Sequence, residues 1–248
     1  AGANVAVRCN GRVIAEDGAG EDGAGSSLIM DEHFRPWSPR DPFLYDVTIT
    51  LAGGDSVESY FAMRKFGVTE LDGKRVLALN NEPIFMNGVL DQGYWSDGLY
   101  TAPADEAMVY DIETMKDLGF NMLRKHIKIE PLRWYYHCDR LGMIVWQDLV
   151  SRISPMTTQV LPFLGFHLRD DKYRRFGRED EASRDQYVQD LYDTVELLYN
   201  TPSLAVWVPF NEGWGQFDSL QMAQILWELD PARLVDPASG WHDQGGGD

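Results

Sequence analysis

The spacing of apolar residues predicts β-structure in the first quarter of the chain. Apolar and polar positions alternate through 43–51 and again through 57–65, with the turn sequence Ala52-Gly53-Gly54-Asp55 between them. Successive side chains of a strand point to opposite faces, so this pattern predicts a β-hairpin. A shorter strand is expected at 5–9. Together these strands predict part of a β-sandwich.

From about residue 82 short apolar runs alternate with segments of helical periodicity. Strands are expected at 83–86, 121–127, 143–146, from 204 and from 234, and helices at 105–118, 131–141, 183–199 and 219–229. This alternation predicts parallel strands joined by right-handed crossovers. A closed β/α barrel has eight such units, and the pattern supplies four and the start of a fifth. We therefore expect part of a longer protein, with 149–182 as an irregular excursion on the active face.

Asn211-Glu212 is the strongest candidate for chemistry. The pair follows the apolar run 204–210 and precedes Gly213. A buried strand that ends in an amide and a carboxylate delivers both side chains to the edge of a sheet, which in a β/α barrel is the active face. A carboxylate held there beside aromatic rings is a candidate proton donor for glycoside cleavage. Alternatively, Glu212 caps the helix that begins near Ser219, or is simply exposed.

The charge and cysteine content exclude several classes of protein. The chain has 39 acidic and 22 basic residues and a formal net charge of −17. Phosphate backbones need a basic surface, which argues against nucleic acid as a partner. No apolar run approaches the ~18 residues of a membrane span, so no membrane span is expected. Cys9 and Cys138 lie far apart and form no zinc-binding spacing, and we expect neither a metal nor a cofactor.

A tandem acidic repeat occupies 16–25 and contains a literal Gly-x-Gly-x-x-Gly at Gly18, Gly20 and Gly23. A dinucleotide site would need a strand before this motif and a helix after it. Neither is expected, and the segment is acidic where a phosphate would lie. The pattern therefore favours a flexible loop.

Four groups of residues follow one another in a characteristic order. They are Trp37-Ser38-Pro39 with Pro42-Phe43-Leu44-Tyr45, the helix from Asp105-Glu106 with the strand to Arg124, the run Trp134-Tyr135 to Cys138-Asp139-Arg140-Leu141-Gly142, and Asn211-Glu212. In order and spacing they resemble glycoside hydrolase family 2, the β-galactosidase and β-glucuronidase group, over nearly the whole chain. The resemblance implies that 1–66 is the C-terminal part of an immunoglobulin-like β-sandwich domain. It implies that 67–248 is the first half of a (β/α)8 TIM barrel, truncated.

The resemblance implies a retaining exo-glycosidase that hydrolyses β-glycosidic bonds by double displacement and takes a carbohydrate substrate. Glu212 falls where the family carries its acid/base glutamate, and Asn211 where an asparagine hydrogen-bonds the sugar 2-hydroxyl. The nucleophile is expected near the end of the seventh strand, beyond Asp248. Retention needs two carboxyl groups about 5–5.5 Å apart, so this chain by itself is expected to be inactive. A homo-oligomer is compatible with the sequence.

Other strand ends supply further candidates for contact with the sugar. Asp91 follows the first expected strand, His126 ends the second, Asp148 follows the third, and Trp214 and Trp241 follow the fourth and fifth. The alternative for His126 is a core histidine, and that for Trp214 is core packing. Asp148 could instead pair with an arginine such as Arg124.

The chain departs from the family pattern at three strand ends. Members often carry Arg-x-Ser-His after the second strand, whereas Arg124-Lys125-His126 places the histidine one position early, and such a shift reverses the face of a side chain. Gln92 stands where a histidine is frequent. Gln147-Asp148 stands where many relatives have Asp-Glu, whose glutamate binds a metal in some galactosidases.

Two rival functions remain open at the level of sequence. One is a non-catalytic glycan-binding protein that retains the barrel, against which the Asn-Glu pair argues. The other is a different retaining β/α-barrel glycanase, against which the β-sandwich segment before the barrel argues. An esterase is disfavoured because no Gly-x-Ser-x-Gly elbow occurs.

Overall fold

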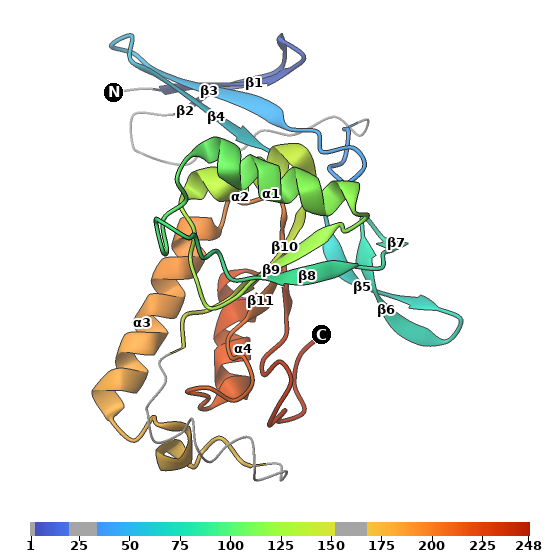
Figure 1. Ribbon diagram of the computed structural model, residues 1–248. Helices are drawn as coiled ribbons and strands as arrows, with labels where there is room; N and C mark the ends of the chain where they lie inside the picture. The colour runs from blue at the N-terminus through green and yellow to red at the C-terminus, as the bar shows by residue number, and fades with distance from the viewer. Residues whose placement is uncertain (1–2, 20–33, 152–167) are drawn as a thin grey trace. The chain divides into compact units, whose positions relative to one another are not determined.

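A computed structural model describes residues 3–19, 34–151 and 168–248 of the chain (Figure 1). Its contacts divide the chain into two compact units, Ala1–Arg64 and Lys65–Asp248. No helix in the described ranges is long and apolar enough to cross a membrane.

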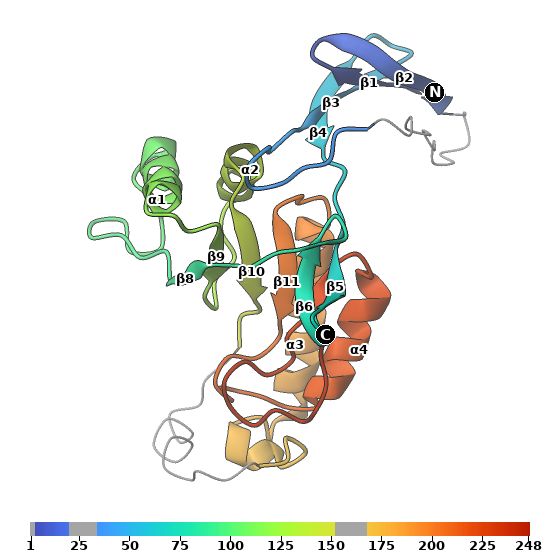
Figure 2. The same ribbon diagram turned by 90° about the vertical axis from the view of Figure 1, so that its right-hand side faces the viewer.

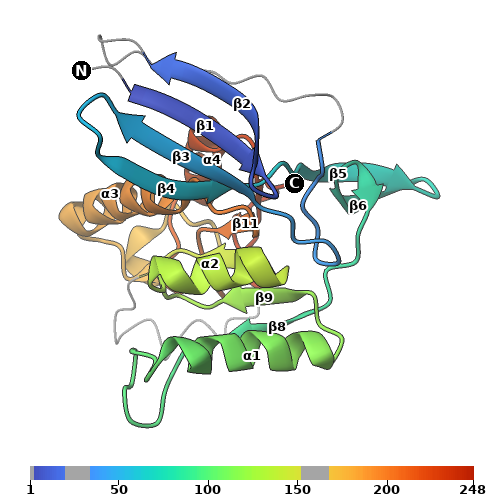
Figure 3. The ribbon, with the colours of Figure 1, turned by 90° about the horizontal axis from the view of Figure 1, so that it is seen from above.

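The first unit is built on one antiparallel sheet of four strands in the order β2-β1-β3-β4 (Figure 3). The strands are β1 at Ala3–Cys9, β2 at Arg12–Ala19, β3 at Tyr45–Leu51 and β4 at Ser56–Phe61. The expected hairpin of β3 and β4 is confirmed, with Tyr45 opposite Phe61. Their rings stack with centroids 5.2 Å apart, a cross-strand contact that stabilises the pairing.

The prediction of a flexible loop is wrong for the start of the acidic repeat, because β2 continues through Glu16 to Ala19 and pairs with β1. Residues 20–25 of the repeat lie outside the described ranges. The missed signal is Asn10-Gly11, whose φ angles of 51° and 77° suit a two-residue hairpin turn. β2 is an edge strand, where exposed acidic side chains are tolerated.

The second unit begins with a three-stranded antiparallel sheet, β5-β6-β7. The strands are β5 at Phe66–Leu71, β6 at Lys74–Leu79 and β7 at Glu82–Pro83. The expectation of a barrel strand at 83–86 is wrong, since Pro83 pairs antiparallel with Ala78 and Phe85 is 84% exposed. Proline cannot donate to a sheet ladder, which confines it to edges and strand ends. The first parallel strand therefore starts later, as β8 at Gly88–Asp91.

A five-stranded sheet in the order β12-β11-β10-β9-β8 forms the centre of the second unit (Figure 2). The remaining strands are β9 at Met122–Lys125, β10 at Ile144–Asp148, β11 at Leu204–Val208 and β12 at Leu234–Val235. Every neighbouring pair is parallel, which confirms the strand direction expected from the strand–helix alternation. Parallel strands place all their carboxyl ends at one edge of the sheet.

The connecting helices are α1 at Asp105–Asp117, α2 at Leu132–Leu141, α3 at Glu181–Leu198 and α4 at Ser219–Leu229. The ends of α2 follow from local rules, because Pro131 precedes it and Gly142 ends it with a φ of 75°. α1 ends one residue earlier than expected, at Asp117, and Leu118 after it is exposed.

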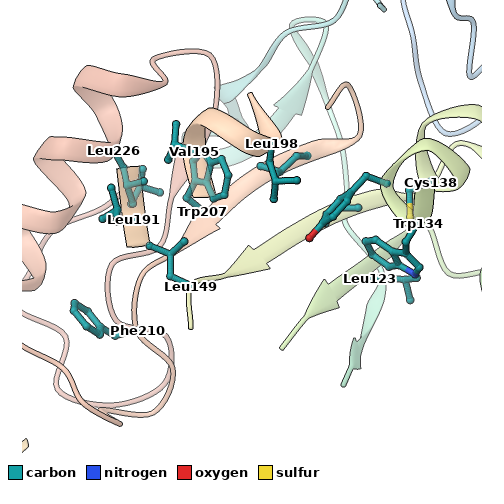
Figure 4. Close-up of a cluster of buried hydrophobic side chains, with 14 of the residues drawn as sticks. Leu123, Trp134, Cys138, Leu149, Leu191, Val195, Leu198, Trp207, Phe210 and Leu226 are labelled. Carbon is teal, nitrogen blue, oxygen red and sulfur yellow. The ribbon is translucent and has the colours of Figure 1, made fainter. Parts of the chain in front are cut away.

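The core of the second unit surrounds β11, whose five residues are all buried. Figure 4 shows Trp207 of this strand among Leu191, Val195 and Leu198 of α3 and Leu226 of α4. A strand buried on both faces has a continuous apolar sequence, as Leu204–Val208 has. This packing fixes the position at which the chain leaves β11 and enters Asn211-Glu212.

Candidate active site

The end of β11 presents Glu212 in an unusual backbone conformation. Asn211 is only 8% exposed and forms a parallel bridge with Ser239, while the Glu212 N–H donates to the Ser239 carbonyl at 2.8 Å. Glu212 is exposed and has a φ of 51°, in the left-handed region. Such a conformation costs of order 1–3 kcal/mol and persists where surrounding contacts impose it. The loop after β12 supplies those contacts and so fixes the backbone position from which the Glu212 side chain extends.

One indole ring contacts this carboxylate, and a second indole lies beside the first. Trp214 Nε1 lies 3.3 Å from Glu212 Oε2 as a donor. The ring of Trp214 is tilted by 46° against that of Trp241, with centroids 6.4 Å apart. Both tryptophans are half-buried. The carboxylate therefore lies at an aromatic surface contributed by the loops after β11 and β12.

Arg124, on β9, joins the ends of four strands. Its guanidinium donates to both oxygens of Asp148 at the end of β10, with Nε–Oδ1 2.8 Å and Nη2–Oδ2 3.3 Å. It also donates to Asn211 Oδ1 at 2.9 Å and to Ser239 Oγ at 2.6 Å. A bidentate arginine–carboxylate pair fixes both position and orientation. Arg124 therefore holds the Asn211 amide in one rotamer.

His126 contacts the other end of the same amide. Its Nε2 lies 3.1 Å from Asn211 Nδ2. An amide nitrogen is a donor and Arg124 already occupies Oδ1, so the imidazole Nε2 is the acceptor in this contact. Asn211 is thus held between Arg124 and His126. Its remaining amide N–H is left to donate to a further acceptor.

Two carboxyl groups beside Arg124 have shifted proton affinities. Burial raises the pKa of Asp148, opposed by the hydrogen bond and charge of Arg124. Burial also raises the pKa of Asp236, just after β12, again opposed by Arg124 and by a hydrogen bond from Ser239. In both cases the loss of solvent outweighs the nearby cation.

A second set of contacts fixes the turn that follows Glu212. Asp170 Oδ2 accepts from the Ser219 N–H at 2.9 Å and from Gln216 Nε2 at 3.1 Å. Buried Arg178 donates from Nε to the Gly215 carbonyl at 2.7 Å. Asp170 therefore supplies the cap at the start of α4 that was the alternative role for Glu212, and Glu212 remains free of that role.

The structure brings together most of the residues singled out in the sequence. Those that meet at one edge of the sheet are Asn211, Glu212, His126, Asp148, Trp214 and Trp241. The alternative pairing of Asp148 with Arg124 is present. Asp91 ends β8 at the same edge, but its side chain points to the opposite face of the sheet, where the carboxylate pairs with Lys125 Nζ at 2.8 Å. Lys125 follows Arg124 on β9 and so points to the opposite face.

Sequence reasoning missed Ser239 and Asp236 and treated Arg124 only as a possible partner. The available signal for Arg124 was its position beside Lys125 in a short strand, where charged residues are rarely buried unless paired. Ser239 carried none, since its role depends on a bridge to Asn211 across 28 residues of chain. Among the described residues no group of three or more His, Cys, Asp or Glu side chains forms a metal-binding cluster.

Comparison with curated proteins finds relatives that are several times longer. The β-galactosidase of Leuconostoc mesenteroides is 29% identical over 234 residues, which cover 94% of this chain and 21% of that protein. The mannosylglycoprotein endo-β-mannosidase of Lilium longiflorum is 31% identical over 186 residues, covering 68% of this chain and 17% of that protein. The chain thus spans about a fifth of the length of these relatives.

Solved structures share the fold at lower identity. The β-D-glucuronidase of Dictyoglomus thermophilum has a TM-score of 0.74 at 17% identity, covering 94% of this chain and 39% of that structure. A galacturonate-bound family 2 β-galacturonidase from Eisenbergiella tayi has a TM-score of 0.69 at 19% identity, covering 95% and 40%. These likenesses show a barrel-type fold. Residues 70–244 match the model of the glycosyl hydrolases family 2, TIM barrel domain, and the chain belongs to this family.

Proposed function

We propose that this chain carries the general acid/base of a retaining exo-β-glycosidase, and that Glu212 is that residue. The observation that carries the proposal is the fixed Asn211-Glu212 pair at the carboxyl end of β11. Catalytic groups of β/α barrels lie at this edge. Family membership and relatives named as β-glycosidases support the same class of reaction.

The geometry suits the two halves of a double displacement. Glu212 protonates the glycosidic oxygen in the first half, and in the second it takes a proton from the water that attacks the glycosyl intermediate. Asn211, held by Arg124 and His126, donates from its amide to the sugar 2-hydroxyl. A rotamer fixed before substrate arrives lets this bond strengthen in the transition state without reorganisation.

We propose that the nucleophilic carboxylate comes from a strand other than the five described here. A closed barrel has eight parallel strands, whereas within the described ranges β8 and β12 each pair on one side only. In the same proposal, 67–248 is the first half of the barrel and 1–66 the end of an immunoglobulin-like domain. The 248-residue chain on its own should then give no sustained turnover of glycosides.

Kinetics of Glu212→Gln in the full-length protein test the assignment. Loss of a general acid should lower turnover about 10²–10⁴-fold for unactivated glycosides, and much less for aryl glycosides whose leaving groups need no proton. Azide should restore activity by attacking the glycosyl intermediate without base assistance. Glu228→Gln, at an exposed glutamate of α4, is the matched control. Near-normal hydrolysis of an unactivated glycoside by Glu212→Gln would overturn the assignment.

The alternative is a glycan-binding protein that has lost its chemistry. It predicts that the full-length wild-type protein binds glycosides in calorimetry but releases no sugar, even from aryl glycosides. Turnover that depends on Glu212 excludes this alternative.

A further inference from the structure

The loop between β8 and α1 is closed by its own hydrogen bonds and carries exposed aromatic rings. Trp95 and Leu99 exchange two backbone hydrogen bonds, of 2.8 and 3.0 Å, and the Thr101 N–H donates to the Gly98 carbonyl at 2.9 Å. A Cβ at Gly98 would lie 2.0 Å from the Thr101 carbonyl oxygen, so only glycine fits. Trp95 packs against the core. The loop is therefore closed by its own backbone hydrogen bonds and attached to the core through Trp95.

Its outer surface carries a pair of tyrosines. Tyr94 is 60% exposed and Tyr100 55% exposed. Their ring centroids are 4.9 Å apart at 65°, and their hydroxyl oxygens lie 2.8 Å apart within hydrogen-bond distance. One hydroxyl donates to the other, which leaves the accepting hydroxyl with its own proton to donate. The pair thus offers apolar ring surface with a polar edge.

Buried charges hold both ends of this loop. Lys128 Nζ donates to the carbonyls of Gly93 and Tyr100, each at 2.7 Å, and lies 5.3 Å from the centroid of the Tyr100 ring. Glu130 accepts from both Lys128 and Lys125 at 2.9 Å. A Cβ at Gly93 would lie 2.3 Å from Glu130 Oε1. Burying three charged groups costs free energy compared with apolar packing. Buried ion pairs of this kind can instead specify one conformation, here that of the loop.

The loop is on the same edge of the sheet as the candidate acid. It leaves the carboxyl end of β8, and Glu212 leaves the carboxyl end of β11 in the same parallel sheet. Figure 1 shows it as the green segment that leads from β8 into α1. In a barrel the loops at this edge together surround the substrate. The Glu212 tryptophans lie after β11 and β12, so the tyrosine pair is a separate surface near the other end of the sheet.

We propose that Tyr94 and Tyr100 bind a pyranose ring of the leaving group, beyond the bond that is cleaved. This inference rests on the proposed glycosidase function and adds a substrate class, β-linked oligosaccharides in place of simple glycosides. A pyranose is amphipathic, with C–H faces that pack on aromatic rings and hydroxyls that match the tyrosine edge. A platform fixed before binding loses little conformational entropy when the sugar is bound.

The test compares two substrates of the full-length protein that share one non-reducing sugar. A β-glycosyl fluoride has no leaving-group ring, whereas a β-linked trisaccharide fills the proposed site. In Tyr94→Ala and Tyr100→Ala we expect kcat/KM for the trisaccharide to fall about tenfold, or 1.4 kcal/mol. The glycosyl fluoride should change less than twofold. Tyr110→Ala, at a tyrosine of α1 that is 69% exposed, is the control and should change neither.

The outcomes separate this inference from the proposed function. If both variants turn over the fluoride and keep the wild-type kcat/KM for the trisaccharide, the tyrosine site is refuted and the glycosidase function stands. Equal losses on both substrates also refute it, because they indicate a disturbed loop. If the wild type hydrolyses neither substrate, the proposed function fails. Calorimetry with the trisaccharide then decides: weaker binding by the Ala variants supports the site, and equal or absent binding overturns it.

Discussion

Replacing Asp230 with asparagine should destabilise the parallel-sheet unit by about 3–5 kcal/mol, the usual cost of breaking a buried ion pair from one side. Asp230 follows α4 and is fully buried. Its Oδ2 accepts from Trp207 Nε1 at 3.0 Å and from the guanidinium of Arg233. Burial lowers the pKa of Arg233, and Asp230 opposes that shift. Asparagine keeps the hydrogen-bonding shape and removes the charge that compensates the arginine.

The size of the loss follows from what Arg233 would retain. Its other donors reach three backbone carbonyls, with Tyr199 O at 2.8 Å, Thr201 O at 2.7 Å and Leu204 O at 3.0 Å. These dipoles keep the guanidinium hydrogen-bonded and hold it in the interior, where it stays desolvated without a counter-charge. A loss of about 3–5 kcal/mol is large beside the ~5–15 kcal/mol total of a typical domain.

Urea denaturation of the purified chain, followed by tryptophan fluorescence, measures this loss. Arg233→Met leaves the opposite charge unpaired and should cost a similar amount. The double variant should lose less than the sum, by a coupling energy of about 1–3 kcal/mol. Glu228→Gln, at an exposed position two residues before Asp230, should stay within about 0.5 kcal/mol of wild type. A loss below about 1 kcal/mol for Asp230→Asn, or strict additivity, would refute the reasoning.

Three further variants probe the loop, the buried hydroxyl and the site carboxyl. Gly93→Ala forces a Cβ into Glu130 at a φ of 66°, so chymotrypsin should nick the neighbouring loop faster than in wild type, and an unchanged rate would contradict the packing. The Tyr135 hydroxyl donates to Gln147 Oε1 at 2.6 Å. Tyr135→Phe removes this donor and should lower the free energy of unfolding by about 1–3 kcal/mol in urea denaturation. For Asp148 the raised pKa means that the folded state holds the proton more tightly than the unfolded chain does. The resulting stabilisation is fully present below the ordinary aspartate pKa of 3.8 and is lost as pH rises through the higher folded pKa. Asp148→Asn removes that loss, so its stability relative to wild type should increase with pH above 3.8, and a flat or falling difference would contradict the direction of the shift.

Local sequence rules determined the elements of this protein. Pro131 and Gly142 bound α2, and the apolar run from Leu204 predicts a strand buried on both faces. The position of Asn211-Glu212 follows from that strand, because a polar pair directly after a buried strand reaches the edge of the sheet. These inferences need only neighbouring residues, since propensity, period and capping act within one element.

The same local rules failed where the partner lies far along the chain. The run at 84–86 is apolar like a barrel strand, yet β7 pairs with β6 and Phe85 is exposed. The acidic residues of β2 resemble a loop, but pairing with β1 makes them a strand. In both cases the hydrogen-bonding partner, which sequence period does not specify, decided the outcome.

The site shows the same division. Sequence placed Glu212, Asn211, His126 and Asp148 at strand ends, which is a statement about topology. Only the tertiary structure shows that Arg124 joins Asp148, Asn211 and Ser239, the last of them 115 residues away. The register of β9 sends Arg124 to one face and Lys125 with Asp91 to the other. Side-chain direction and the choice among charged partners depend on how the strands align and what is buried, and those are properties of the packed sheet.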